Sequence, residues 1–140
     1  MSGGPRQRQH RAQLPRASGA ASTARSLLAE WFGAEMDEDL LHSAQLLASE
    51  LATNAYVHGQ GAIELRAALD EDRLLVEVTD EGSGFEREVG ARSLDELGGR
   101  GLGIVDAEAS RWGIHEGTTH VWFELERPGP RLGEDAKPPL

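Results

Sequence analysis

The sequence contains no cysteine among its 140 residues, which excludes a disulfide framework and metal sites built from thiolates. The lack of cysteine fits a reducing cytoplasm, which is where we expect the protein. No apolar run approaches the length of a membrane-spanning helix, and the arginine-rich N-terminus lacks the apolar segment of a secretory signal. We therefore expect no membrane partner.

Positive charge is also scarce. The formal net charge is −10, and Lys137 is the single lysine. A general nucleic-acid binder carries the opposite balance, so direct binding to nucleic acid is not expected. The first segment is an exception, because it holds the arginines at positions 6, 8, 11 and 16. We expect residues 1–20 to form a flexible basic arm that adds at most one short edge strand near Ala12–Leu14.

The middle of the chain begins with two helical patterns. Apolar residues recur at helical spacing over residues 22–32, and Gly33 supplies a stop. A second helix is expected behind Asp37, a good N-cap, and it breaks at His58-Gly59. Both patterns predict helices with one apolar stripe each, which must pack against another layer.

Strand patterns follow the helices. Apolar residues alternate with polar or small ones over residues 63–69, 74–79 and 121–126, and Asp70-Glu71-Asp72 separates the first two as a turn. A glycine-punctuated segment and a short helix over about residues 102–111 lie before the last strand. This order predicts an α+β two-layer sandwich, with a mostly antiparallel sheet covered by helices on one face. We expect one domain over residues 21–127 and a disordered, proline-rich tail over residues 128–140.

The first candidate motif is the stretch SELATNAYVHGQG, residues 49–61. Glu50 and Asn54 lie one turn apart at the border of the apolar stripe of the second helix. An asparagine carbonyl oxygen suits Mg²⁺, which keeps part of its shell for water and phosphates. A glutamate one turn earlier can act as a general base. Taken alone, the pair is equally compatible with a solvated face near a helix end.

The second motif is VEVTDEGSGF, residues 76–85, in which Asp80 ends a strand. An aspartate there can accept a hydrogen bond from the exocyclic amine of a base such as adenine. Gly82 and Gly84 let a flat base approach the backbone closely. An ordinary Asp/Gly turn is the alternative interpretation.

The third motif is GGRGLGIV, residues 98–105, which places four glycines before a helix start. Backbone N–H groups there can bind an anion such as phosphate. The segment does not follow a strand in a βαβ unit, and it lacks the lysine and hydroxyl of a P-loop. A flexible linker is the alternative, although the residues before it fit a mobile lid with glycine hinges.

In this order, E-x-x-x-N, D-x-G-x-G and G-x-G-x-G resemble the N-box, G1-box and G2-box of the GHKL (HATPase_c) ATPase superfamily, whose ATP-binding fold is the Bergerat fold. The resemblance covers residues 22–126. The 140 residues hold no dimerisation helix with a phosphoacceptor histidine and no transducer domain. The chain therefore resembles the stand-alone, RsbW-like anti-sigma-factor serine/threonine kinases of bacteria.

The resemblance implies a role for each motif residue. Asn54 would hold Mg²⁺, and Glu50 would act as the base on a serine or threonine hydroxyl of a partner. Asp80 would bind the adenine of ATP, and Gly82 and Gly84 would shape the pocket for the base.

The third motif would bind the phosphates through Arg100, Gly101, Leu102 and Gly103. His58 would either face the phosphates or cap the helix, and the cap is the simpler interpretation. The family often has serine or threonine where this chain has His120, which leaves the partner of Asp80 on the last strand open.

The function implied by the resemblance is a kinase that phosphorylates a STAS-domain antagonist and regulates a sigma factor, and a homodimer is a reasonable assembly for it. Two other functions stay open. One is a regulatory module that binds ATP and a partner without catalysis. The other is a detached histidine-kinase catalytic domain that acts in trans.

Overall fold

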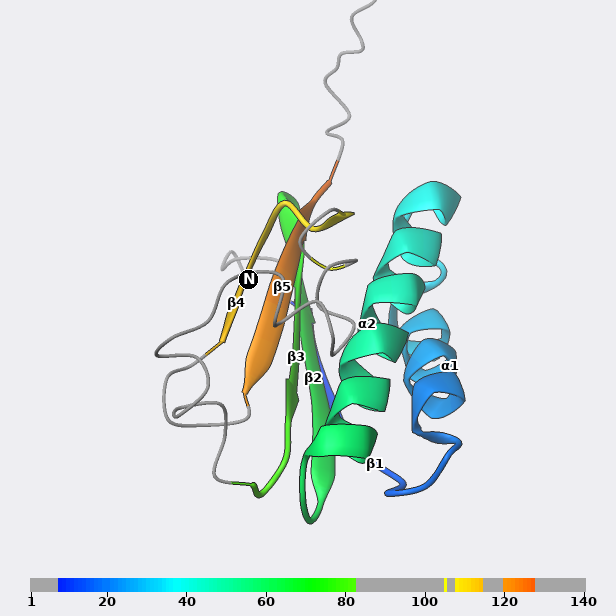
Figure 1. Cartoon of the computed structure of the whole chain (residues 1–140). Helices are drawn as coiled ribbons and strands as arrows, with labels where there is room; N and C mark the ends of the chain where they lie inside the picture. Colours follow the sequence, from blue (N-terminus) through cyan, green and yellow to red (C-terminus); the bar gives the residue numbers. More distant parts are fainter. Residues whose placement is uncertain (1–7, 83–104, 106–107, 115–119, 128–140) are drawn as a thin grey trace, which may run out of the picture.

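The computed structural model describes residues 8–82, 105, 108–114 and 120–127. Its elements, in chain order, are β1 (Arg8–Leu14), α1 (Ala20–Phe32), α2 (Glu38–His58), β2 (Ile63–Leu69), β3 (Arg73–Thr79), β4 (Arg111–Ile114) and β5 (Val121–Glu126). Both helices lie on one side of the sheet (Figure 1). The predicted two-layer α+β architecture is confirmed.

The strands form one five-stranded sheet in the order β1-β2-β3-β5-β4. Every neighbouring pair is antiparallel. The register places Leu65 opposite Val78, and Val76 opposite Phe123. Because residues directly opposite one another share a face of the sheet, the apolar residues of the central strands line one face together.

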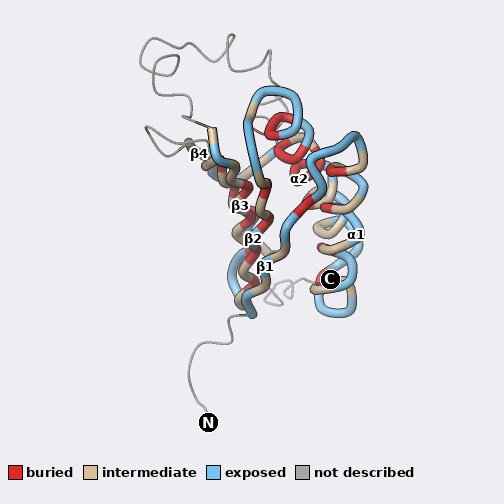
Figure 2. The backbone as a smooth tube through the Cα atoms, turned by 90° about the horizontal axis from the view of Figure 1, so that it is seen from below, coloured by how far each residue is buried: buried red, intermediate tan, exposed pale blue. Residues whose placement is uncertain are grey.

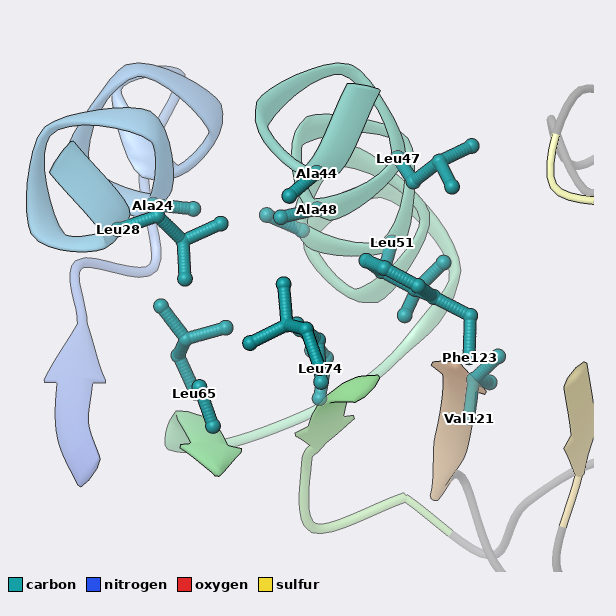
Figure 3. Packing of buried hydrophobic residues seen from close by; sticks show 14 of the residues in the cluster. Ala24, Leu28, Ala44, Leu47, Ala48, Leu51, Leu65, Leu74, Val121 and Phe123 are labelled. Atoms are coloured by element: carbon teal, nitrogen blue, oxygen red, sulfur yellow. The ribbon is translucent and has the colours of Figure 1, made fainter. Parts of the chain in front are cut away.

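That apolar face packs against the helices and forms the core. Alternate residues of β2, β3 and β5 are buried, and the residues between them are half-buried or exposed (Figure 2). Leu28 of α1 and Leu51 of α2 lie toward Leu65, Leu74 and Phe123 of the sheet (Figure 3), and Leu47 of α2 is also buried. The alternation in the sequence therefore reports which face of each strand is covered.

The helices follow their predicted signals. The side chain of Asp37 accepts a hydrogen bond from the backbone N–H of Leu40 at 3.0 Å, which makes it the N-cap of α2, as predicted. The first helix begins at Ala20, two residues before the expected start. In the part of the chain that the structure describes, no helix has the length and apolar character needed to cross a membrane.

Two elements differ from the expectations. The N-terminal edge strand is longer than expected, because β1 pairs with β2 from Arg8 to Leu14. The expected helix over residues 102–111 cannot reach its predicted end, because Arg111 begins β4, a strand that the sequence did not predict. The Trp122 ring lies so close to Gly113 in β4 that a β-carbon there would be 2.8 Å from it. Position 113 therefore has no room for a side chain, and this short strand lacks the alternation of apolar and polar residues that would have predicted it.

Candidate functional site

Helix α2 places Glu50 and Asn54 on one side, four residues apart. Asn54 is only 5% exposed, while Glu50 is half-buried. Asn54 lies next to Ala55 and one turn after Leu51, both of which belong to the core. The pair therefore sits at the border of the buried face, where the sequence predicted it.

Among the described residues, the side-chain carbonyl oxygen of Asn54 has no hydrogen-bond partner. The Oδ1 atom is buried and accepts no hydrogen bond from any described residue. Leaving a buried acceptor unsatisfied costs about 1–3 kcal/mol, so a hydrogen-bond donor or a cation at this oxygen would be stabilising. A hard carbonyl oxygen fits Mg²⁺.

In the part of the chain that the structure describes, other metal ligands are not gathered around Asn54. Within the described ranges, no group of three or more His, Cys, Asp and Glu side chains could hold a metal ion. A cation bound at Asn54 would therefore depend on ligands from outside this set. Water and phosphate oxygens, which Mg²⁺ commonly uses, would complete its shell.

Asp80 lies at the tip of β3, beside the C-terminal end of α2. Its Oδ1 atom accepts hydrogen bonds from the backbone N–H groups of Gly82 at 2.7 Å and Gln60 at 3.4 Å. The backbone N–H of Glu81 donates to the carbonyl of Gln60 at 2.7 Å. Both segments lie at the same end of the molecule (Figure 1). The structure thus brings the first two motifs together.

The bond from Gly82 to Asp80 is the bond of an ordinary Asp/Gly turn, so that local interpretation of the motif is correct as far as it goes. It does not exclude binding of a base. A carboxylate has about four acceptor positions, so the bond to Gly82 does not by itself occupy the whole group.

A residue that the sequence did not single out reaches the same end of α2. Arg16, two residues after β1, donates from Nη2 to the carbonyl of Ala55 and from Nη1 to that of Tyr56, each at 2.8 Å. Its Nε donates to the carbonyl of Gly61 at 2.6 Å. No local sequence pattern identifies an arginine whose partners lie about 40 residues away.

The other predicted site residues are less fully placed. His58 is the last residue of α2 and is exposed, which agrees with a position at the helix end. The Nε2 atom of His120 lies 3.1 Å from a carboxylate oxygen of Glu77 on β3. The remaining residues lie outside the described part of the chain, so their roles stay predictions: Gly84, Arg100, Gly101, Leu102 and Gly103.

Comparisons with known proteins agree with this geometry. The chain is similar in structure to the RsbU and RsbW domains of Rv1364c from Mycobacterium tuberculosis, with a TM-score of 0.62 and 24% identity. The match covers 87% of this chain but only 33% of the other, so the chain spans about a third of that protein's length. At this identity the likeness shows the fold alone.

No sequence among the curated proteins matches the chain. Residues 14–125 do match the family described as the histidine kinase-like ATPase domain. The match extends over most of the chain and includes α2, the tip of β3 and the last strand. The chain therefore belongs to the histidine kinase-like ATPase domain family.

Proposed function

We propose that the chain is an ATP-dependent serine/threonine kinase of the anti-sigma-factor type, which phosphorylates a STAS-domain antagonist and regulates a sigma factor. The observation that carries this proposal is the position of a buried, unpartnered Asn54 carbonyl oxygen on the helix whose end contacts Asp80. An ATPase family supports nucleotide binding at that place. The structural relative carries an RsbW domain, which supports the regulatory type.

Each motif would bind a different part of the Mg²⁺-bound nucleotide. Asn54 would hold Mg²⁺, which screens the charge of the phosphates when it is bound. Asp80 would accept a hydrogen bond from the exocyclic amine of adenine, next to Gly82 and Gly84. The phosphates would lie against the third motif: Arg100, Gly101, Leu102 and Gly103.

Glu50 would act on the protein substrate. Its carboxylate is half-buried, one turn before Asn54, so it can reach a hydroxyl brought beside the metal-bound phosphates. Glu50 would accept the proton of a serine or threonine hydroxyl while the hydroxyl oxygen bonds to the γ-phosphorus of ATP. The bond between the γ-phosphorus and the oxygen that bridges it to the β-phosphate breaks, and ADP leaves.

The proposed function also implies a cellular location and an assembly. A sigma factor and its antagonist work in the cytoplasm, so we propose that location and, as assembly, a homodimer. We propose the expected division into an arm (1–20), an ATP-binding domain (21–127) and a tail (128–140), with β1 of the arm paired to the edge of the sheet. Direct contact with nucleic acid is not part of the proposal.

The direct test is calorimetric titration of the full chain with ATP, with and without Mg²⁺, for the wild type and Asn54→Ala. We expect magnesium-dependent binding by the wild type and a loss of at least about 100-fold in Asn54→Ala, because the metal would lose its proposed protein ligand. Wild-type protein that binds no ATP would overturn the proposal.

Transfer of radiolabel from ATP to a purified STAS-domain protein then separates the alternatives. Acid-stable label on the partner supports the serine/threonine kinase. Acid-labile label indicates a histidine-kinase domain acting in trans. ATP binding without transfer to any partner indicates a non-catalytic module.

A further inference from the structure

The carbonyls in the last turn of α2 are not all satisfied by donors within the helix. The last four carbonyls of a helix have no partner within it, and a following residue in the left-handed conformation often supplies donors. Gly59, the residue after α2, is instead extended, with φ −94° and ψ −167°. Its N–H donates to the carbonyl of Ala55 at 2.9 Å. The remaining carbonyls need donors from other segments or from water.

Arg16 supplies those donors. Two of its nitrogens donate to the carbonyls of Ala55 and Tyr56 in the last turn of α2. A positive charge is favoured at this end by the helix dipole. The connection from β1 to α1 lies at the same end of the molecule as the end of α2 (Figure 1). The cap is therefore contributed by a segment distant in sequence.

The same guanidinium also holds the loop after α2. Its Nε donates to the carbonyl of Gly61, whose φ of +71° is left-handed. Only arginine offers planar donors that reach three carbonyls at once, because lysine has a single nitrogen. Arg16 thus fixes both ends of the short segment from Tyr56 to Gly61.

That segment is the one that contacts Asp80. Gln60 donates its N–H to the Asp80 carboxylate and accepts from the N–H of Glu81. Gly59 packs against the same carboxylate so closely that no side chain fits between them. A change that loosens the segment therefore loosens one wall around Asp80.

We propose that Arg16 is a positioning residue for base recognition: it holds residues 59–61 in the place that orients Asp80 toward adenine. This inference rests on the proposed function, in which Asp80 recognises the exocyclic amine. The hydrogen bonds that the structure shows for Arg16 go to backbone carbonyls, which fits a supporting role and not direct binding. Its effect reaches the base through the loop after α2.

The first test needs no nucleotide. Amide hydrogen exchange of the full chain is compared for the wild type, Arg16→Ala and the control Arg11→Ala, whose arginine is exposed on β1. We expect exchange at the amides of Gly59, Glu81 and Gly82 to become at least about tenfold faster in Arg16→Ala alone, as for loss of a charge-assisted hydrogen bond. Amides of Leu65 and Val76 in the sheet serve as internal references. Unchanged exchange at the three amides, or an equal rise at the reference amides, would overturn the proposal.

The second test measures selectivity. Mg²⁺-ATP and Mg²⁺-GTP are titrated into the same variants and into Arg16→Lys. We expect Arg16→Ala to lower the preference for ATP over GTP by about tenfold, and Arg16→Lys to recover only part of it. A variant that melts earlier but keeps the wild-type preference shows a purely structural role and overturns the proposal. If the wild type binds neither nucleotide, the proposed function fails, while the exchange experiment still decides whether Arg16 holds the loop.

Discussion

The carboxylate of Asp80 occupies the space that a side chain at position 59 would need, since a β-carbon on Gly59 would overlap it. The close approach of residue 59 at the end of α2 to Asp80 at the tip of β3 therefore requires glycine at position 59. Gly59→Ala should push Asp80 away and lower ATP affinity by about tenfold or more, which calorimetric titration measures.

Gly19→Ala is the matched control for Gly59→Ala. Gly19 is the N-cap of α1, and a β-carbon there would have no neighbour within 4 Å. This variant should bind ATP as the wild type does. Equal affinities of the two variants would show that the approach of residue 59 to Asp80 has no part in binding.

The carboxylate of Glu50 is the proposed base, and its replacement should separate binding from chemistry. Glu50→Gln keeps the size of the side chain but cannot accept a proton in the same way. We expect ATP affinity to stay within about threefold of the wild type, while phosphotransfer to the STAS-domain substrate falls by about 100-fold or more. The measurement is single-turnover transfer of labelled phosphate. Transfer at the wild-type rate would show that another group takes the proton.

Arg127 joins two connections at the other side of the fold. Its guanidinium donates to the carbonyls of Asp70, in the turn between β2 and β3, and of Glu35, between the helices, at 2.8 and 2.9 Å. Arg127→Ala should lower the free energy of unfolding by about 1–3 kcal/mol, because both carbonyls lose a charged donor. Urea unfolding measures this loss, and ATP affinity should not change.

Arg73→Ala is the control for Arg127→Ala. Arg73 is exposed and makes a long ion pair of 3.9 Å with the half-buried Glu124, and pairs near the surface contribute at most about 1 kcal/mol. A loss in Arg127→Ala no larger than that in Arg73→Ala would mean that the two carbonyls are equally well satisfied by water.

Most of the fold could be predicted because its signals are local. The alternation in β2, β3 and β5 and the N-cap at Asp37 each depend on neighbouring residues. The strand β4 could not be predicted, since its four residues acquire their role from pairing with β5 and from the space that Trp122 takes beside Gly113. A pattern of one strand does not contain that information.

The candidate site also has features that the sequence could predict and features that depend on tertiary packing. Glu50, Asn54 and Asp80 could be proposed from motif spacing, and the structure places α2 and the tip of β3 in contact. The unpartnered state of the Asn54 oxygen depends on burial by other segments, so spacing could not predict it. Arg16 was missed for the same physical reason, because the fold brings the end of α2 and the loop after it beside the connection from β1 to α1, which carries this arginine.

The pairing of β1 along β2 has a practical meaning for anyone who shortens the chain. The family match begins at residue 14, and a fragment cut there would lose all of β1 but Leu14. The backbone of β2 from Ile63 to Leu69 would then lie open at the rim of the sheet, with apolar side chains on one of its faces. An open rim of this kind recruits strands from other molecules, so the shortened protein should precipitate where the longer one stays dispersed.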